Sequence, residues 1–266
     1  MLNAQNACLP VGAAQMDYIT FGRGEKHLIM LPGLGDGLLT VKGKALPFAL
    51  LYRMYAKDFR VWMFSRKVPL PERATTRDMA NDLSYAMDAL GILRAHIYGV
   101  SMGGMIAQHL AIDHPQKVDK LVLAVTTPKA EPVLTGNLDR WTEMARRGDY
   151  ASLMADNLRQ MYTADYVRRN RWLLPITTRV GKPKSFRSFL VQAQACRTHD
   201  AAEHIGEITA PTLVLGGAQD HTLDPNGSRL LAEGIPNSRL HLWPDYGHAV
   251  YDEAKDFDAR ILDFLK

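Results

Sequence analysis

The sequence predicts an α/β protein with a mostly parallel β-sheet flanked by helices. Six short, continuous apolar runs are typical of strands that are buried on both faces of a sheet. Longer amphipathic stretches separate several of these runs, and such alternation favours right-handed parallel connections. The chain has 266 residues, of which 47 % are hydrophobic and 23 % are charged. That length allows one large domain or two small ones, and the composition excludes general disorder.

The expected elements follow one another along the chain. Strands are expected at 27–31, 60–64, 96–100, 121–125, 212–215 and 240–243, and an additional one at 18–21. Helices are expected at 77–90, 102–112 and 256–265. Gly91 supplies a stop for the first helix, and the second ends before Pro115.

The stretch 128–206 interrupts this alternation, because it contains no strand signal. It is too long for a loop in a compact domain, and it holds helical patterns rich in Arg, Met and aromatic residues. We therefore expect a helical insertion that sits on the sheet. The corresponding domains are a core of 1–127 and 207–266 and an inserted cap of 128–206.

Composition and charge argue against several classes of protein. The net charge is +4, and no run of Lys and Arg is long enough to predict a nucleic-acid or membrane partner. Cys8 and Cys196 lack metal-ligand spacing, so they are expected to be free thiols, and no metal is expected. The N-terminus lacks the features of a signal peptide, and no apolar run approaches roughly 18 residues. We expect a cytoplasmic protein.

The residues Gly99-Val100-Ser101-Met102-Gly103 form a G-x-S-x-G pattern between an expected strand and an expected helix. In that context a sharp turn lifts the serine hydroxyl above the sheet. The turn also places Ser101 at a helix N-terminus, where unpaired N–H groups favour negative charge. Ser101 is therefore the candidate nucleophile.

A serine nucleophile needs a base, and the base needs an acid. His248 is the candidate base, because it follows the last expected strand and comes last in the chain order. Asp220 follows the strand at 212–215, at the same carboxyl edge of the sheet, and is the preferred acid. The order Ser101, Asp220, His248 is one of the known triad orders. Asp224 in the same loop and Asp245 are the rivals of Asp220.

Acyl transfer also needs hydrogen-bond donors for the developing oxyanion. The N–H of Met102 follows from the turn itself, and the glycine-rich loop at 32–37 offers the N–H of Leu34. A phosphate-binding loop is disfavoured there, because no Gly-Lys-Ser/Thr follows.

Together, these motifs resemble the α/β-hydrolase superfamily over nearly the whole chain. The matching features are the turn at 99–103, the loop at 32–35, the acid loop with Asp220 and the final Gly247-His248. The resemblance implies a mostly parallel eight-stranded sheet, a helical cap after the sixth strand, an acyl-enzyme intermediate and no cofactor. Ser101 also distinguishes the chain from relatives that dehalogenate alkanes or open epoxides, since those use an aspartate at this turn.

Two positions depart from the pattern of the superfamily. Pro32 stands where relatives often have a histidine, which leaves the support of the oxyanion loop open. The segment 65–69 replaces an Asp-x-x-Gly turn that faces the pocket edge in the family. Its basic pair, Arg66 and Lys67, either contacts a substrate or belongs to a solvated loop.

The favoured function is hydrolysis of a small carboxylic ester through Ser101, His248 and Asp220. The alternatives are a carbon–carbon bond hydrolase, a lactonase or an acyltransferase of the same fold, and a ligand receptor without catalysis. Trp141, Tyr162 and Trp172 of the cap are candidates to line the substrate pocket, with packing inside the cap as the alternative role. The expected partner is a small-molecule ester, and the sequence leaves a homodimer open.

Overall fold

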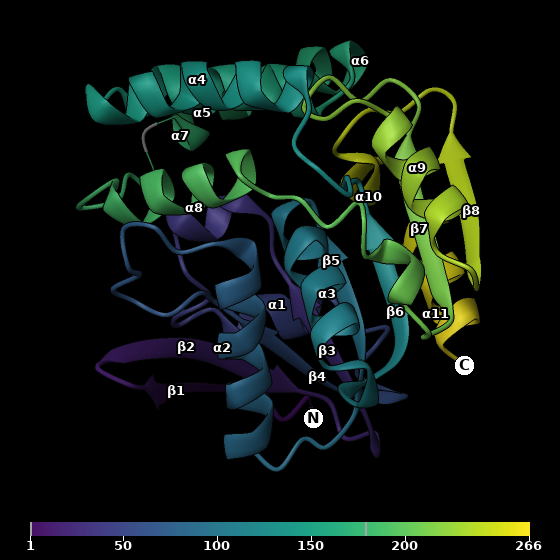
Figure 1. The fold of residues 1–266 in the computed structure, drawn as a ribbon. Coiled ribbons are helices and arrows are strands. Elements are labelled where there is room, and N and C mark those ends of the chain that lie inside the picture. Colours follow the sequence, from purple (N-terminus) through teal and green to yellow (C-terminus); the bar gives the residue numbers. More distant parts are fainter. Residues whose placement is uncertain (1, 179) are drawn as a thin grey trace.

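The computed structural model describes residues 2–178 and 180–266, and eight of their segments form one β-sheet. The strands are β1 (Gln5–Val11), β2 (Ala14–Phe21), β3 (Lys26–Leu31), β4 (Phe59–Phe64), β5 (Ala95–Val100), β6 (Val118–Ala124), β7 (Thr212–Gly217) and β8 (Ser238–Trp243). Their order in space is β1-β2-β4-β3-β5-β6-β7-β8 (Figure 1). The strands from β3 to β8 pair in parallel, and β2 pairs antiparallel with β1 and β4. The predicted α/β architecture is confirmed.

Strand β1 is the element at the edge of the sheet that the sequence analysis missed. Its side chains are mostly exposed or half-buried, so the segment lacks the continuous apolar run that marks the central strands. It also contains Pro10, which only an edge strand accommodates readily. The expected strand at 18–21 is the second half of β2.

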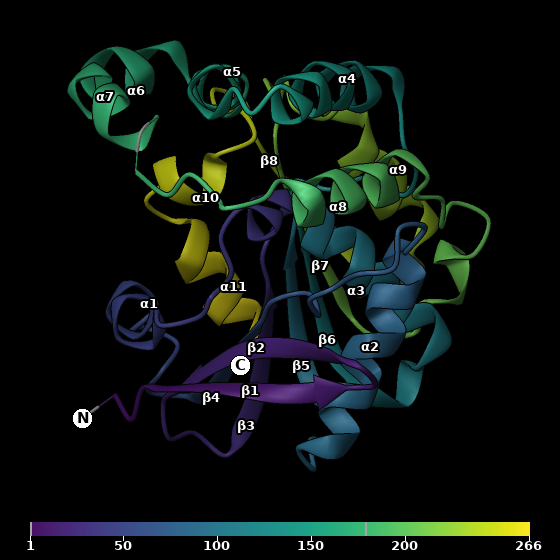
Figure 2. The same cartoon turned by 90° about the vertical axis from the view of Figure 1, so that its left-hand side faces the viewer.

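The two faces of the sheet are covered by different helices, as Figure 2 shows. In β3, Ile29 and Leu31 pack on one face and Leu28 and Met30 on the other, because side chains alternate along a strand. The first face is covered by α2 (Thr76–Ala89), α3 (Met102–Asp113) and α9 (Asn226–Gly234). The second is covered by α1 (Ala45–Leu51), the short α10 (Val250–Glu253) and α11 (Phe257–Leu265).

Local chemistry fixes where the first long helix begins. The Thr75 side chain accepts a hydrogen bond from the backbone N–H of Asp78, and the Asp78 carboxylate accepts one from the Thr75 N–H. This reciprocal capping box satisfies two backbone donors that the first turn leaves unpaired. The helix therefore begins one residue before the expected 77–90.

The chain between β6 and β7 is helical in its described part, apart from an isolated bridge between Lys129 and Asp200. Its α-helices are α4 (Pro132–Arg146), α5 (Tyr150–Met161), α6 (Ala164–Arg169), α7 (Leu174–Thr177) and α8 (Arg187–Arg197). They lie above the carboxyl ends of the parallel strands (Figure 1). Apolar side chains of α4 and α8, such as Leu138 and Phe189, join the core that α2 and α3 share. The division of the chain at 128 and 206 into core and cap stays a prediction.

No helix in the described ranges 2–178 and 180–266 is both long and apolar enough to cross a membrane.

Candidate active site

Ser101 lies at a tight turn between β5 and α3. Its backbone has φ 54° and ψ −121°, which is unfavourable for a residue with a side chain and is typical of strained functional positions. The flanking glycines allow the turn, because a Cβ at Gly99 would lie 2.4 Å from the Gly103 carbonyl oxygen. A Cβ at Gly103 would lie 2.0 Å from the Leu31 carbonyl oxygen. No residue other than glycine fits at either position.

His248 lies in the loop after β8 and is bonded to the acid that the sequence analysis preferred. Its Nδ1 is 2.7 Å from Oδ2 of Asp220, and both residues are buried. The other carboxylate oxygen of Asp220 accepts hydrogen bonds from the N–H groups of Thr222 and Leu223, at 2.7 and 2.9 Å. Because both oxygens are held, the carboxylate is fixed in a position that orients the imidazole ring.

The two rival acids point elsewhere. Asp224 accepts a hydrogen bond from the N–H of Asn226, the first residue of α9, and its own N–H donates to Glu131. Asp245 is exposed and lines a separate cavity of about 760 Å³. Asp220 is therefore the acid that the structure pairs with His248.

Ser101 and His248 both line a cavity of about 330 Å³ beneath the helices that follow β6. The end of β7 packs closely on the loop that carries His248, because Gly217 has no side chain. A Cβ at Gly217 would lie 2.3 Å from the carbonyl oxygens of Tyr246 and Gly247. The remaining wall is mostly apolar. Its apolar members are Leu34, Leu38, Leu39, Val41, Phe48, Val100, Trp141, Leu153, Met154, Met161, Phe189 and Tyr251, and its polar side chains are Asp36, Lys44, Asn157 and Thr222.

The expected oxyanion donors both lie beside Ser101. Met102 is the first residue of α3, and Leu34 begins the 3-10 turn η1 (Leu34–Gly37). The preceding Gly33 is close enough that a Cβ there would lie 3.8 Å from Ser101 Oγ. Within the described chain, neither the Leu34 nor the Met102 N–H donates a hydrogen bond. Two free donors next to a candidate nucleophile are suited to bind an oxyanion.

Comparison with known proteins agrees with this geometry. The sequence profile of the alpha/beta hydrolase fold matches residues 26–255. The chain belongs to the α/β-hydrolase fold family. A 2-hydroxy-6-oxononadienedioate/2-hydroxy-6-oxononatrienedioate hydrolase from Cupriavidus pinatubonensis (strain JMP 134 / LMG 1197) is 31 % identical over 92 % of this chain and 88 % of its own length. A second hydrolase with that substrate name, from Pseudomonas putida, is 29 % identical over 95 % of this chain and 92 % of its own length.

Solved structures show the same fold. The enol-lactonase from Burkholderia xenovorans LB400 superimposes with a TM-score of 0.82 at 23 % identity, over 97 % of this chain and 99 % of its own. An α/β-hydrolase enzyme from a Medee basin deep-sea metagenome library reaches a TM-score of 0.84 at 21 % identity, over 97 % of both chains.

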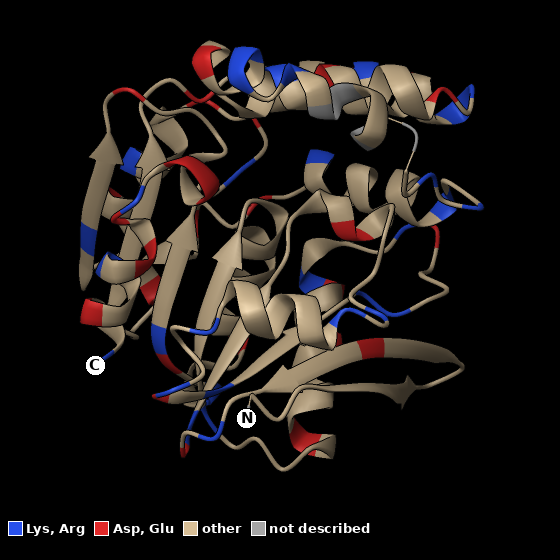
Figure 3. Ribbon diagram, turned by 180° about the vertical axis from the view of Figure 1, so that it is seen from behind, with Lys and Arg blue, Asp and Glu red and all other residues tan. Residues whose placement is uncertain are grey.

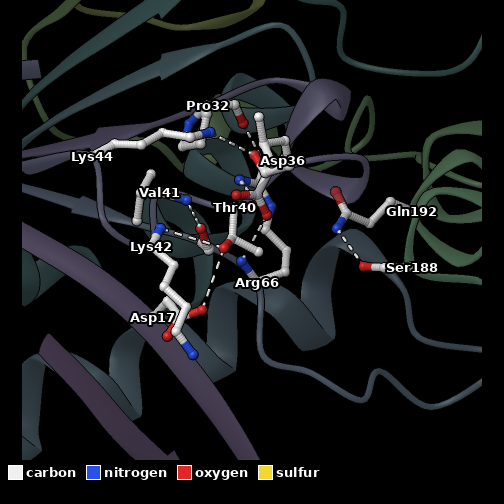
Figure 4. Close-up of polar contacts among 12 residues, drawn as sticks. Asp17, Pro32, Asp36, Thr40, Val41, Lys42, Lys44, Arg66, Ser188 and Gln192 are labelled. Atoms are coloured by element: carbon white, nitrogen blue, oxygen red, sulfur yellow. Dashed lines mark hydrogen bonds and ion pairs between the residues drawn. The ribbon is translucent and has the colours of Figure 1, made fainter. Parts of the chain in front are cut away.

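Arg66 supports the oxyanion loop in this member of the family (Figure 4). Its side chain is buried, and Nη2 donates a hydrogen bond of 2.5 Å to the carbonyl oxygen of Pro32. Its backbone N–H donates to Asp36 Oδ2 at 2.9 Å, and Nη1 lies 3.9 Å from the same oxygen. Burial lowers the pKa of the guanidinium, and the Asp36 carboxylate opposes that shift. Both roles expected for Arg66 are wrong, since it lies neither in a solvated loop nor in the cavity lining.

The opposite side of the oxyanion loop is held by α8. A Cβ at Gly37 would lie 2.7 Å from Cα of Phe189, so η1 packs directly on the backbone of α8. Ser65 Oγ accepts a hydrogen bond from the N–H of Val41 at 2.9 Å and fixes the chain that follows η1. Lys67 pairs with Asp82 at 2.7 Å and does not line the cavity.

The three aromatic residues predicted to line the pocket have different positions. Trp141 lies in the wall of the catalytic cavity, and its indole N–H donates to Asp156. Tyr162 lines the separate cavity of about 760 Å³ and donates its hydroxyl to Asp252. Trp172 is 66 % exposed, so it neither packs inside the cap nor lines the catalytic cavity. Aromatic residues in an amphipathic insertion carry no sequence signal that separates these environments.

The sequence analysis missed the part of the wall formed by residues 38–48. Lys44 is the cationic side chain of this part, and Phe48 belongs to α1. Burial lowers the pKa of Lys44, and the Asp36 carboxylate partly offsets that effect. No catalytic motif marks this segment, and α1 was not expected, so only the folded chain brings it to Ser101.

The helices above the sheet form hydrogen bonds to the loops that carry Asp220 and His248. Asn137 of α4 donates to the carbonyl oxygens of His221 and Thr222 in the acid loop. At the other loop, the N–H of Ala249 donates to the carbonyl oxygen of Met161 at 2.8 Å. The loops that carry Asp220 and His248 therefore depend on these helices for part of their hydrogen bonding.

In the described residues, no group of three or more His, Cys, Asp or Glu side chains is placed to hold a metal ion.

Proposed function

We propose that the chain is a serine hydrolase that cleaves the carbon–carbon bond next to a ketone in a small substrate bearing a carboxylate. The observation that carries the proposal is the arrangement of Ser101, the Asp220–His248 pair and two free N–H donors around one cavity. The two curated relatives described above are hydrolases of 2-hydroxy-6-oxo dienedioates, and this supports the choice of bond.

In this proposal His248 takes the proton of Ser101 while Oγ attacks the ketone carbonyl. The N–H groups of Leu34 and Met102 stabilise the oxyanion. The carbon–carbon bond then breaks, and its electron pair moves to the leaving carbon, where a conjugated carbonyl of the substrate delocalises it. That carbon takes the proton from His248, and the acyl group stays on Ser101. Water, activated by His248, then hydrolyses the acyl-enzyme and restores Ser101.

Lys44 is the proposed anchor for the substrate carboxylate. It lies directly before α1 and lines the cavity that contains Ser101. An ammonium group removed from bulk water binds a carboxylate more strongly than an exposed one. Lys44→Met is expected to raise the KM for a carboxylate substrate while leaving that for its methyl ester nearly unchanged. Lys44→Arg, which keeps the charge, serves as the matched variant.

Ester hydrolysis is the second candidate, and the charge balance of the cavity favours it. The wall holds one carboxylate, Asp36, as well as one ammonium, Lys44. Because Asp36 is paired with Arg66, Lys44 is the cation of this wall that faces a substrate. A dicarboxylate brings two negative charges to this single cation, whereas a neutral ester or lactone brings none.

The deciding experiment compares purified wild type with Ser101→Ala on two substrates. One is a 2-hydroxy-6-oxo-dienoate, followed by loss of its visible absorption, and the other is a series of p-nitrophenyl esters. The proposal expects turnover of the dienoate, lost by about 10⁴-fold or more in Ser101→Ala. Activity on esters alone would replace the proposal by its second candidate. Turnover that persists in Ser101→Ala would contradict both.

A further inference from the structure

One side of the molecule carries most of the exposed large apolar side chains. Fourteen such residues occur in the described part of the chain, and eight of them come from only two stretches of sequence, 39–54 and 172–180. The eight residues, called the entrance face below, are Leu39, Leu46, Leu50, Leu51, Met54, Trp172, Ile176 and Val180. Apolar exposure concentrated in this way marks a binding surface, whereas scattered apolar residues do not.

The two stretches lie on the same side of the fold. Figure 2 places α1 and α7 at the same edge of the molecule, and in Figure 3 both helices face the viewer. An added Cβ at Gly181 would lie 3.8 Å from Leu39, so the segment after α7 reaches the loop before α1.

The entrance face borders the cavity that contains Ser101, and it meets that cavity at Leu39. Leu39 belongs to it and also lines the cavity that contains Ser101. Phe48, on the inner side of α1, forms part of the same wall, while Leu46 and Leu50 of that helix are exposed. A large partner bound here would therefore lie next to the cavity that contains Ser101.

The surroundings of the face are basic. The sequence from 166 to 199 contains eight Lys and Arg residues and no Asp or Glu. Three of these cations form ion pairs with acids outside this stretch, namely Arg168, Arg187 and Arg197. In contrast, Arg171, Lys182 and Lys184 are exposed and form no ion pair within the described residues. They lie close in sequence to Trp172 and Val180.

We propose that the entrance face binds to the surface of an anionic phospholipid bilayer, with the mouth of the cavity turned toward the lipid. Aliphatic side chains, an exposed tryptophan and unpaired cations together are the chemistry of peripheral membrane binding. A second copy of the chain fits less well, because a two-fold interface would bring the same unpaired cations against each other.

A nucleic acid also fits less well, since it stacks on aromatic rings and gains little from exposed Leu, Ile and Val. The sequence analysis expected no membrane partner because no run of Lys and Arg is long. The face instead combines two stretches about 120 residues apart, which a search for runs does not detect. Bound in this way, the enzyme would receive amphiphilic substrates directly from the lipid.

The test is co-sedimentation of the full chain with vesicles of phosphatidylcholine, compared with vesicles of equal parts phosphatidylcholine and phosphatidylglycerol. We expect binding to the anionic vesicles that weakens as salt is raised. Trp172→Ala/Ile176→Ala should abolish it, and Lys182→Gln/Lys184→Gln should weaken it by about thirty-fold, at about fivefold per lysine.

Matched controls come from the opposite end of the sheet. Leu93→Ala removes an apolar side chain that is 81 % exposed, and Lys26→Gln removes an exposed cation at the start of β3. Both should bind as the wild type does. Because all these side chains are exposed, folding is checked by circular dichroism alone.

Failure of the wild type to sediment with anionic vesicles would overturn the proposal, as would equal binding by the entrance-face and control variants. A wild-type dimer that Trp172→Ala/Ile176→Ala converts to a monomer would also overturn it, because the face would then be an interface between copies. The readout needs no substrate, so it is independent of the proposed reaction.

Discussion

Replacing Arg66 with Met is expected to destabilise the fold and impair catalysis together. The guanidinium is buried against Asp36 and donates to Pro32 in the oxyanion loop. Removing one partner of a buried ion pair costs about 3–5 kcal/mol, because the other charge stays buried without compensation. The second oxygen of Asp36 does not compensate for the lost ion pair, since this Oδ1 has no hydrogen-bond partner in the described chain. We expect a loss of about 3–5 kcal/mol, a large part of a typical total stability of about 5–15 kcal/mol.

The catalytic effect follows from the position of the Leu34 N–H, two residues after Pro32. Loss of one oxyanion donor lowers kcat by about 10²–10³-fold. Because Arg66 does not line the cavity, KM should change little, and the fall should appear in kcat.

The assay is urea unfolding together with steady-state kinetics for Arg66→Met, Asp36→Asn and the double variant. The double variant also lacks the unpaired carboxylate of Asp36, so it should be more stable than Arg66→Met, since the two effects are coupled. Recovery of stability without recovery of kcat is the expected pattern, because the hydrogen bond to Pro32 is still absent. A stability loss below about 1 kcal/mol, the value of one ordinary hydrogen bond, or an unchanged kcat would refute the reasoning.

Three further predictions follow from the packing and the buried titratable groups. Gly103→Ala should destabilise the fold by about 3 kcal/mol or more, because its Cβ would meet the Leu31 carbonyl oxygen. In contrast, the Cβ of Gly136→Ala in α4 meets nothing within 4 Å, so this variant should be more stable by up to about 1 kcal/mol. Urea unfolding measures both free energies, and equal effects would be inconsistent with the turn geometry. Burial lowers the pKa of His199 to about 3, so its neutral form is favoured by folding, and the stability it supports is complete above about pH 6.5 and is lost as the pH falls below that value. His199→Asn should flatten the fall in unfolding free energy between pH 6.5 and pH 4, and an unchanged slope would argue against this origin. Tyr162→Phe leaves Asp252 without the hydroxyl at 2.6 Å and should lower the melting temperature, with a cost of about 1–3 kcal/mol; no shift would mean that the contact does not form in solution.

The sequence predicted the parts of the site that depend on local chemistry and on strand order. Ser101 stands out because its flanking glycines and the strand–helix context require the turn that the structure shows. His248 and Asp220 could be placed together because parallel strands end at one edge, so that the loops after β7 and β8 meet. The continuous apolar runs predicted most of the central strands, because these strands are buried on both faces along their length.

The remainder depends on tertiary packing that leaves no local pattern. Arg66 looks like a surface residue, and its burial follows from the position of Pro32 and Asp36, about thirty residues earlier in the chain. Lys44 reaches the cavity because it lies at the start of α1, whose Phe48 forms part of the same wall. Trp172 illustrates the opposite error, since its apolar character predicted burial and the structure exposes it.

The most direct test of the central claim is covalent labelling with a fluorophosphonate probe, with the modified residue located by mass spectrometry. We predict one adduct, on Ser101, that is absent in Ser101→Ala and forms far more slowly in His248→Ala, because the base that activates the hydroxyl is then missing. A wild-type protein that is correctly folded but unlabelled, or labelled at another residue, would contradict the assignment of Ser101 as the nucleophile.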